Sequence, residues 1–321
     1  MRVAVLSGGR SSEHDVSLLS GAAVARGLRE FGHEPVEVTI DRNGRWSSAG
    51  GTVELRPGEG LLDAEVVFPA LHGPFGEDGS VQGLLEQLDV AYVGSDVLSS
   101  AICMDKLTLK RLFAAHGVPQ VEFAAVGEEG WWERCQGLGL PLWVKPSRLG
   151  SSVGITRVAE LGQLDEAVEL ALRHDPRAIV EASAAGREVE CSVLGNREPE
   201  TSLPGEIVFQ RDWYDFEAKY TEGGMELRVP APIEEAAATR VRELAVEVFE
   251  LAGCSGLARC DFFVEPDGEV LVNEINTMPG FTDLSVYAKL FEASGLPYAE
   301  LCDRLVELAV ERHREARSYE F

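Results

Sequence analysis

Two carboxylates and an amide stand close together near the C-terminal end of the sequence, at Asp261, Glu274 and Asn276. They belong to ARCDFFVEPDGEVLVNEIN, in which apolar runs flank EPDG, a strong turn signal, so a β-hairpin is predicted over residues 258–276. Hard cations prefer such oxygen ligands, and Mg²⁺ commonly binds through one or two carboxylates plus substrate phosphates. Either carboxylate alone would more often pair with an arginine on a solvated sheet face. The three together, followed by the turn TMPG, favour a divalent-metal site.

The register of the hairpin decides whether these oxygens meet. Because side chains alternate along a strand, Glu274 is expected on the same face as Val270 and Val272. If the loop has an even number of residues, Arg259 lies opposite Glu274 and Asp261 lies diagonal to it, about 7–8 Å away. An odd-length loop with a bulge would separate the carboxylates, and both alternatives stay open.

Two glycine-bearing turns can approach an anion closely. The stretch WVKPSRLGSSVGI, residues 143–155, matches neither the P-loop pattern nor G-x-G-x-x-G. Its backbone amides and serines can still form a phosphate nest, with Lys145 supplying charge from the strand end, although an ordinary hairpin loop explains the same composition. Gly280 follows the metal-ligand candidates directly, and its backbone N–H can serve as an oxyanion donor.

The N-terminal stretch SGGRSSEHDVS, residues 7–17, resembles a nucleotide-binding turn only loosely. Asp41 can stand for the acidic residue that a Rossmann fingerprint requires, so a nicotinamide-dependent dehydrogenase remains an alternative. Glu13 can instead hold a cationic amine at the mouth of a parallel sheet. His14 and His72 are more often hydrogen-bonded turn histidines than catalysts.

The elements that must position these residues alternate between strand and helix in the first hundred residues. Such alternation predicts a parallel sheet flanked by helices. The expected strands are 2–6, 37–40, 65–73 and 90–95, and the expected helices are 16–31 and 81–88.

A second unit begins with a helix over residues 99–116, which ends at Gly117-Val118-Pro119. Strands separated by a glycine-rich turn and one helix follow, and then a long polar insertion with aromatic residues. The expected strands are 140–147, 154–159, 177–183 and 188–195, the insertion is 209–224, and the further helices are 161–173, 234–252 and 298–315.

Composition and charge limit the classes of function. The 321 residues include 29 basic and 54 acidic side chains, a net charge of -25, which argues against nucleic acid and membrane as main partners. No stretch approaches the roughly 20 apolar residues of a membrane span, and the start lacks the features of an export signal. The six cysteines form no C-x-x-C pair, so a reduced cytoplasm is expected.

Lysine is scarce in this chain. Arginine fills most basic positions, so each retained lysine invites a specific role, such as a point contact to a phosphate oxygen. The lysines are Lys106, Lys110, Lys145, Lys219 and Lys289.

In order along the chain, several long stretches resemble the D-alanine:D-alanine ligases, members of the ATP-grasp carboxylate-amine ligases. The resemblance covers nearly the whole chain and implies an ATP-grasp fold, α/β with an α+β ATP-binding part, preceded by a parallel-sheet α/β domain. It implies an N-terminal domain over residues 1–101, a central ATP-grasp domain over 102–184 and a C-terminal ATP-grasp domain with the metal site over 185–321. The stretches are GGRSSEHDVSLLSG, ALHGPFGEDGSVQGLLE, YVGSDVLSSAICMDK, VKPSRLGSSVGI, FEAKYTEGG and GLARCDFFVEPDGEVLVNEINTMPGFTDLS.

The same resemblance implies ATP-dependent ligation of two D-alanine molecules through an acyl phosphate, for peptidoglycan precursors. ATP and two Mg²⁺ ions, with Mn²⁺ as a substitute, would be the cofactors, and a homodimer is compatible with the family. The alternatives are another ATP-grasp ligase, including one that makes a D-alanine:D-lactate ester, and a nucleotide-binding regulator without turnover. Intact Arg259 argues against the regulator, because a pure binder needs no oxyanion donor.

Site residues also follow from the resemblance. Glu13 would bind the ammonium of the first D-alanine, and its link to Ser151 and Tyr220 would close the loop DFEAKYTEGG. The lid over the phosphates would be residues 212–224. The implied sets are Glu13, Ser151, Tyr220, Arg259 and Gly280 for catalysis; Glu13, His72 and Ser285 for substrate; Lys106, Lys145, Ser152, Glu181, Ala184, Glu188 and Lys219 for the nucleotide; and Asp261, Glu274 and Asn276 for metal.

The sequence departs from its relatives at two positions. Leu149 stands where a glutamate is common, and Ala182 stands where a lysine is often found, so side-chain contacts to the nucleotide are in doubt there. Tyr220 is typical of members that form a dipeptide, which favours the amide product over the ester.

Overall fold

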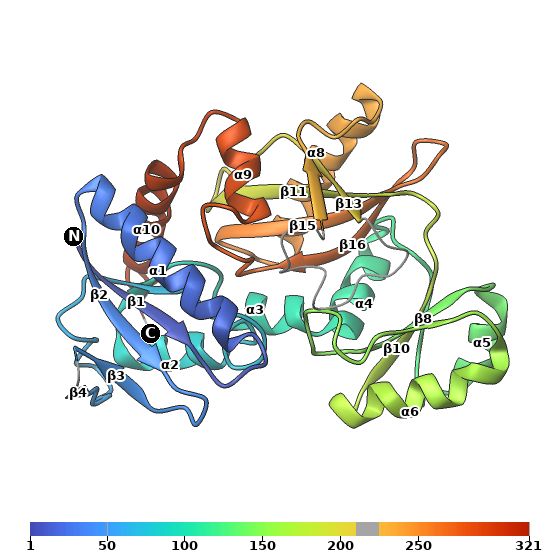
Figure 1. Ribbon diagram of the computed structural model, residues 1–321, viewed down its shortest axis with the longest axis horizontal. Coiled ribbons are helices and arrows are strands. Elements are labelled where there is room, and N and C mark those ends of the chain that lie inside the picture. Colours follow the sequence, from blue (N-terminus) through green and yellow to red (C-terminus); the bar gives the residue numbers. More distant parts are fainter. Residues whose placement is uncertain (50, 210–224, 321) are drawn as a thin grey trace.

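The computed structural model describes residues 1–49, 51–209 and 225–320. In this part of the chain three sheets follow one another, each with helices against it (Figure 1).

The first sheet is built around a parallel core. Strand β1 pairs in parallel with β2 and β5, and β5 pairs in parallel with β6, as the alternating pattern predicts. The antiparallel strands β3 and β4 extend one edge and were not predicted. The elements are β1 (Arg2–Gly8), α1 (His14–Phe31), β2 (Glu34–Ile40), β3 (Trp46–Ser48), β4 (Gly51–Thr52), β5 (Val66–Pro69), α2 (Ser80–Leu88) and β6 (Ala91–Tyr92).

The prediction of a single helix over residues 99–116 is wrong, because the helix is interrupted at Asp105. Helix α3 (Val97–Met104) ends there and α4 (Lys106–His116) begins. Asp105 is extended, and its carboxylate caps α4 by accepting the N–H of Thr108 at 3.1 Å and the hydroxyl of Ser147 at 2.8 Å. The break sets α4 on a new axis, with Lys106 and Lys110 one turn apart on the same face.

The second sheet is antiparallel, in the order β7-β10-β8-β9. Its strands β8, β9 and β10 and the helix α6 were predicted, whereas β7 and α5 were not. Leu142, Val144 and Val180 pack in the cluster that includes residues of α5 and α6. By alternation Lys145 and Glu181 lie on the opposite face. The elements are β7 (Phe123–Ala125), α5 (Trp131–Gly137), β8 (Leu142–Pro146), β9 (Thr156–Val158), the 3₁₀ helix η1 (Leu161–Gln163), α6 (Leu164–His174) and β10 (Ala178–Ala182).

The third sheet is antiparallel, in the order β14-β13-β11-β15-β16, with β12 on β11. Its core joins α8 and α4: Val248 of α8 and Phe113 of α4 belong to one buried cluster with Cys260 of the sheet. Strands β12, β13 and β14 and helix α9 were not predicted. The elements are β11 (Arg187–Gly195), β12 (Glu200–Thr201), β13 (Gly205–Phe209), β14 (Met225–Arg228), α8 (Glu235–Leu251), β15 (Gly256–Val264), β16 (Val270–Asn276) and α9 (Val286–Ala293).

The predicted hairpin exists, but its expected register is wrong. Asp261 lies directly opposite Glu274, and Arg259 lies opposite Asn276 rather than opposite Glu274. The cause is a bulge: Phe262 pairs with Val272, which leaves Asn273 as an extra residue in β16.

The bulge also reverses the alternation. Val270 and Val272 are buried, and so is Ile275, whereas Glu274 is only partly buried. The expectation that Glu274 shares a face with the two valines is therefore wrong. One extra residue lets the apolar residues of β16 enter the core while the polar residues after it face the opposite side.

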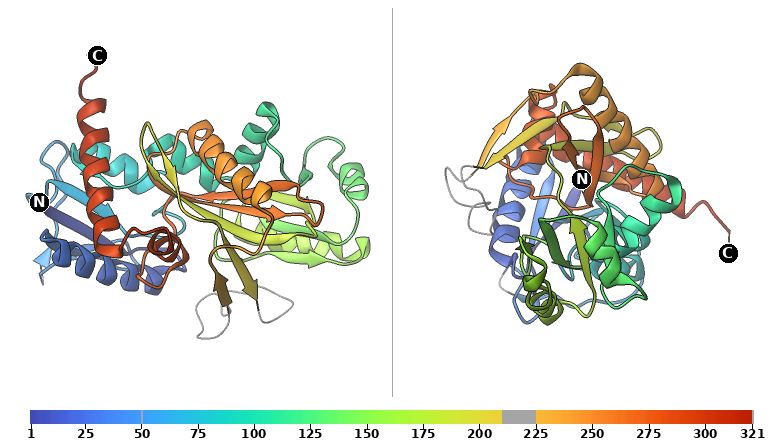
Figure 2. Two further views of the ribbon diagram at one scale, coloured as in Figure 1. Left: turned by 90° about the horizontal axis from the view of Figure 1, so that it is seen from above. Right: turned by 90° about the vertical axis from the view of Figure 1, so that its right-hand side faces the viewer.

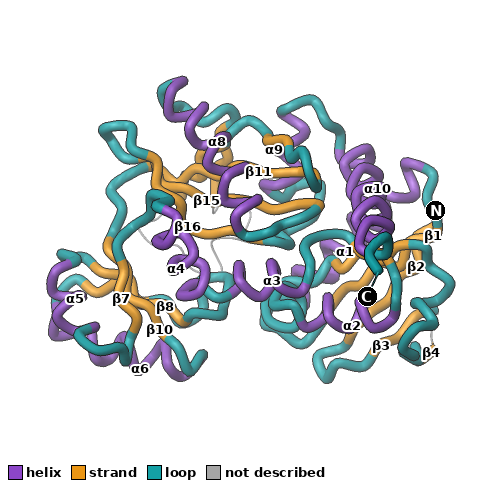
Figure 3. Tube along the Cα trace, turned by 180° about the vertical axis from the view of Figure 1, so that it is seen from behind, coloured by secondary structure: helices purple, strands orange, loops and turns teal. Residues whose placement is uncertain are grey.

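The last helix returns to the first sheet. Helix α10 (Tyr298–Ala316) buries Leu305 in one cluster with Val5 of β1, and Arg312 donates to the Tyr92 carbonyl at 3.1 Å. Figures 2 and 3 show this C-terminal helix beside the N-terminal elements. None of the described helices has both the length and the apolar character needed to cross a membrane.

Replacing Leu305 by alanine should loosen this docking, because Leu305 is fully buried. We expect the free energy of unfolding in urea to fall by about 2–5 kcal/mol, the usual cost of such a truncation. Leu19→Ala, at a side chain that is 66% exposed on α1, should change it by less than about 0.5 kcal/mol. Equal effects of the two substitutions would contradict the packing of α10.

Candidate active site

A cavity of about 230 Å³ lies between the second and third sheets. Both sheets contribute residues to its wall, and so does Lys106 at the start of α4. Most of the residues predicted to bind nucleotide or metal line it. Those that do are Lys106, Lys145, Ser152, Glu181, Ala184, Glu188, Asp261 and Glu274. Two residues predicted for catalysis, Ser151 and Arg259, also line it.

The third sheet presents an ionic cluster to this cavity. Arg259 donates two hydrogen bonds to Asp261, at 2.7 and 2.8 Å, and its Nε lies 2.9 Å from Glu190 Oε2. Burial opposes the charge on Arg259, but the carboxylates of Asp261 and Glu190 raise the pKa of Arg259 well above its usual value. Asn276 donates to Asp261 at 3.0 Å, so the amide joins the same cluster although it does not line the cavity.

The second sheet presents a carboxylate held by two lysines. Glu181 Oε2 lies 2.6 Å from Lys145 Nζ, and Glu181 Oε1 lies 3.2 Å from Lys110 Nζ. Burial acts to raise the pKa of Glu181, but Lys110 and Lys145 outweigh it and lower that pKa to about 2. Glu181 is therefore a carboxylate at neutral pH.

Lys106 joins the two sheets across the cavity. Its Nζ lies 3.3 Å from Glu274 Oε2 and donates to the Leu149 carbonyl at 3.1 Å. Ser151 and Ser152, in the turn after Leu149, both have a positive φ, at 51° and 60°. These two left-handed residues form a tight turn, and the backbone N–H groups of such a turn can line a concavity for an anion.

Glu13 reaches the cleft from the start of α1. Ser151 donates its hydroxyl proton to Glu13 Oε1, which connects the first sheet to the glycine-serine turn. Gly73 leaves no room for a Cβ beside the Glu13 carboxylate. Tyr220, the third member of the expected link, lies outside the described residues, as do Lys219 and the candidate lid over residues 212–224.

His72 is a buried tether. Its Nε2 lies 2.8 Å from the Ser20 hydroxyl and its Nδ1 lies 3.0 Å from the Met278 carbonyl. Burial lowers the pKa of His72, although the nearby Glu13 carboxylate opposes this. Ser20 also accepts the N–H of Phe281 at 3.3 Å, so α1 and His72 together fix the turn that carries the oxyanion candidate.

The structure brings Gly280 and Ser285 together at that turn. A Cβ on Gly280 would lie 3.3 Å from the Ser285 hydroxyl, and this hydroxyl accepts the N–H of Thr282 at 2.9 Å. The turn thus has a fixed shape before any substrate enters.

Some residues of the cluster were missed from the sequence. Lys110 follows Lys106 by one helical turn, so its spacing was a usable signal. Glu190 becomes a neighbour only through strand pairing, since it lies opposite Asp261 in β11, and no local pattern shows this. Glu77 was also missed. It accepts the N–H of Gly73 at 2.6 Å, and the negative charge of Glu13 acts to raise its pKa.

Within residues 1–49, 51–209 and 225–320, no group of three or more His, Cys, Asp or Glu side chains is arranged to hold a metal ion. The candidate set has a different composition, with two carboxylates and one amide. Such a set fits an ion that takes its remaining oxygens from substrate phosphates.

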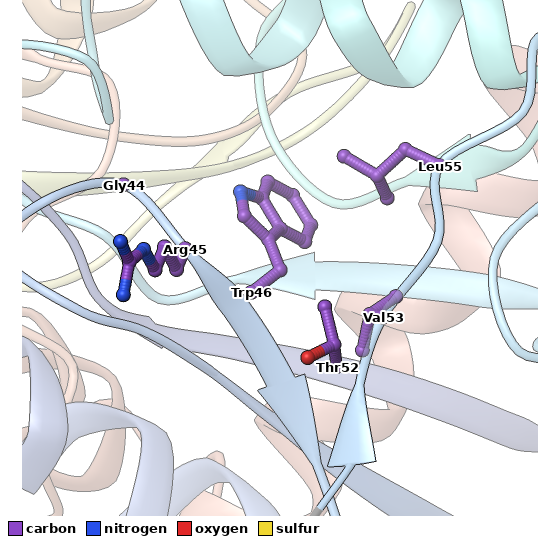
Figure 4. Close-up of a pocket in the computed structure, with 6 residues that line it drawn as sticks. All are labelled: Gly44, Arg45, Trp46, Thr52, Val53 and Leu55. Atoms are coloured by element: carbon purple, nitrogen blue, oxygen red, sulfur yellow. The ribbon is translucent and has the colours of Figure 1, made fainter.

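A second hollow lies at the edge of the first sheet, around Trp46 and Leu55 (Figure 4). Its lining offers one guanidinium, from Arg45, but no carboxylate and no cysteine or histidine. None of the candidate residues contributes to it, so the chemistry is assigned to the cleft between the second and third sheets.

Comparisons with known proteins cover almost the whole chain. Residues 112–307 match the family described as D-ala D-ala ligase C-terminus, and residues 2–60 and 50–95 match D-ala D-ala ligase N-terminus. The chain is 44% identical to a D-alanine–D-alanine ligase from Solibacter usitatus, over 100% of this chain and 99% of that protein. It is 45% identical to one from Deinococcus radiodurans, over 97% and 98%.

Solved structures agree. The D-alanine-D-alanine ligase from Coxiella burnetii superposes with a TM-score of 0.90 at 36% identity, covering 99% of this chain and 96% of that one. A D-Ala:D-Ser ligase from Enterococcus faecalis superposes with a TM-score of 0.88 at 35% identity, covering 96% of this chain and 99% of that one. These likenesses confirm the expected ATP-grasp fold.

Glu77 should make stability depend on pH. Desolvation, and then the charge of Glu13, raise the pKa of Glu77 from 4.5 to about 8. The folded protein therefore holds this proton more tightly than the unfolded chain, and the resulting stability is complete below pH 4.5 and is lost as the pH rises through about 8. We expect Glu77→Gln to flatten the fall in free energy of unfolding over this range, measured without nucleotide or metal.

The matched control is Glu129→Gln, at an exposed carboxylate far from Glu13 in sequence. It should leave the pH profile of stability as it is. A Glu77→Gln profile that coincides with the wild-type profile would refute the raised pKa of Glu77.

Proposed function

The chain belongs to the D-alanine–D-alanine ligase family, and we propose that ATP and D-alanine react in the cleft between its second and third sheets. The enzyme joins two D-alanine molecules with a carbon–nitrogen bond at the expense of ATP, a step of peptidoglycan synthesis. The observation that carries the site assignment is the meeting of Lys106, Lys145 and the Asp261–Glu274 pair around one cavity.

The reaction needs ATP because a carboxylate is a poor electrophile without a leaving group. Phosphorylation of the first D-alanine supplies one, and the amine of the second then attacks the acyl phosphate. Lys106 and Lys145 lie where they can offset charge on the transferred phosphoryl group, with the turn at Ser151 and Ser152 cradling it. Arg259 and the Gly280 N–H are proposed to stabilise the oxyanion of the tetrahedral state.

The rest of the nucleotide is proposed to lie along the strands that follow. Glu181 and the backbone at Ala184 would meet the adenine, and Glu188 the ribose hydroxyls. All three line the cavity, and Phe262 and Trp143 add apolar surface to the same wall. Ala182 also lines it, so the departure there removes a side-chain contact and leaves backbone contacts available.

Mg²⁺ is the proposed metal, with Asp261, Glu274 and Asn276 as its protein ligands and Mn²⁺ as a substitute. Asp261 stands opposite Glu274 on paired strands, and hard oxygen donors of this kind suit Mg²⁺. When bound, the ions would neutralise phosphate charge as Lewis acids. With metal bound, Asp261 would still contact Arg259, and Glu274 would contact the metal in place of Lys106.

Glu13 is proposed to hold the ammonium of the first D-alanine, in a position fixed by Ser151. Ser285 is proposed to contact the carboxylate of the second D-alanine, beside the oxyanion donor Gly280. His72 acts on this substrate site by fixing the turn at Met278. Lys219 and Tyr220 are kept as proposals from their motif.

We further propose a division into domains, a cellular location and a class of partners. The chain is divided into an N-terminal domain (1–101), a central domain (102–184) and a C-terminal domain (185–321). It works in the cytoplasm, alone or as a homodimer. It acts on small molecules and binds neither nucleic acid nor membrane, as its net charge of -25 favours.

A purified-protein assay tests the substrate assignment. Phosphate release from ATP should require D-alanine and yield D-alanyl-D-alanine, with L-alanine inert. D-serine and D-lactate are tested as second substrates, because a D-Ala:D-Ser ligase is among the similar structures. Preference for either over D-alanine would overturn the substrate assignment, and ATP binding without turnover would indicate a regulator.

Glu274→Gln should lower kcat by about 100-fold or more, the scale seen when a prepared electrostatic contact to a transition state is removed. Its unfolding should change little, because Glu274 is only partly buried. Glu269→Gln, at an exposed glutamate before the same strand, is the matched control and should keep full activity. Wild-type kcat in Glu274→Gln would contradict the metal assignment.

A further inference from the structure

Glu181 is held by more positive charge than a single carboxylate needs. Its side chain is 3% exposed and contacts two lysines, Lys145 at 2.6 Å and Lys110 at 3.2 Å. Burial lowers the pKa of Lys110, although the Glu181 carboxylate opposes this. With both lysines protonated, the three groups carry one negative and two positive charges. One lysine would suffice to neutralise a buried carboxylate, so the second calls for a reason.

The two lysines differ in access. Lys145 lines the cavity and its side chain is 14% exposed, whereas Lys110 is 2% exposed and is not part of the cavity wall. Lys145 can therefore turn toward a ligand in the cavity. Lys110 has no path to one and remains with Glu181.

Lys110 is held in place by its own surroundings. Helix α4 packs Leu107 against Ile179 of β10, two residues before Glu181. The ammonium lies 5.8 Å from the centre of the Phe123 ring, and the Gln120 side chain donates to the Lys110 carbonyl at 2.8 Å. The approach of Lys110 to Glu181 is thus built into the contact between α4 and the second sheet.

Lys145 has two competing partners, the phosphates of the nucleotide and the Glu181 carboxylate. The proposed function places phosphates near Lys145, whereas in the structure Lys145 is paired with Glu181. If Lys145 were the only partner of Glu181, its departure would leave an ionised carboxylate buried without a counter-charge, which is strongly unfavourable. The cost would be subtracted from the affinity for the phosphates.

We propose that Lys110 is a positioning residue that keeps Glu181 ionised and in place, so that Lys145 is released to the nucleotide phosphates at little cost. This inference rests on the proposed function, since it takes Lys145 as a phosphate ligand. It assigns different roles to two lysines that contact the same carboxylate: one is exchanged during binding and the other is permanent.

The test compares affinities for ADP and adenosine, measured by calorimetry with Mg²⁺ present. Lys110→Met should weaken ADP binding by about tenfold, within the range of coupling energies between contacting residues, and should leave adenosine binding nearly unchanged. Lys289→Met, on α9 and outside the cleft, is the matched control and should alter neither affinity. If Lys110→Met does not fold, Lys110→Gln takes its place.

A second substitution separates this role from a structural one. In the Glu181→Gln background there is no carboxylate for Lys145 to leave, so Lys110→Met should no longer weaken ADP binding. Equal losses for ADP and adenosine, or a loss of ADP affinity that persists in the double variant, would overturn the inference.

The proposed function fails separately. If the wild-type protein bound ADP no more tightly than adenosine, the cleft would not be a phosphate site, and both proposals would fall. A preference for ADP that is the same in the wild type and in Lys110→Met would leave the site assignment standing and would refute only the role of Lys110.

Discussion

In the described part of the chain, each of the three cations that line the proposed nucleotide site is paired with a carboxylate of the same cleft. Lys106 pairs with Glu274, Lys145 with Glu181 and Arg259 with Asp261. In a partly buried cleft, an unpaired charge would be costly, so a site prepared for a polyanion must store its positive charge against negative charge of its own. With the proposed function, nucleotide binding would be an exchange of partners, in which the cations would contact the phosphates and the carboxylates would be free to hold metal.

Two local irregularities of the backbone make this pairing possible. The break at Asp105 starts α4 beside the second sheet, so that Lys106 points across the cavity to Glu274 while Lys110 reaches Glu181 from behind. The extra residue Asn273 places Glu274 directly opposite Asp261 and leaves the apolar residues of β16 in the core. Both features lie at the cleft, which is where regular secondary structure is most often interrupted for function.

Much of the fold could be predicted from local patterns. The turn EPDG and its apolar flanks indicate the hairpin, and the alternation of strand and helix in the first hundred residues indicates the parallel sheet. The register of the hairpin could not be predicted, because the position of a bulge depends on which residues fill a core made by α8 and α4. The break at Asp105 was missed because the apolar periodicity continues through it, although Asp is a favoured capping residue.

The sequence predicted many of the residues of the site, but not which of them contact one another. The motifs bring Lys106, Lys145, Asp261 and Glu274 into one cavity as expected. Lys110 and Glu190 were missed as site residues, because their roles come from neighbours that are distant in sequence. Glu181 was predicted only as a nucleotide contact, and its position between Lys110 and Lys145 became visible only in the structure.

The central claim is that Asp261, Glu274 and Asn276 grip divalent metal against the phosphates of a nucleotide. Crystals grown with ADP and Mn²⁺ test it most directly, through the anomalous scattering of manganese. We expect anomalous peaks beside the oxygens of these three residues, with Lys106 turned from Glu274 toward phosphate. Peaks elsewhere, or nucleotide bound with Glu274 still paired to Lys106 and no metal beside it, would contradict the account.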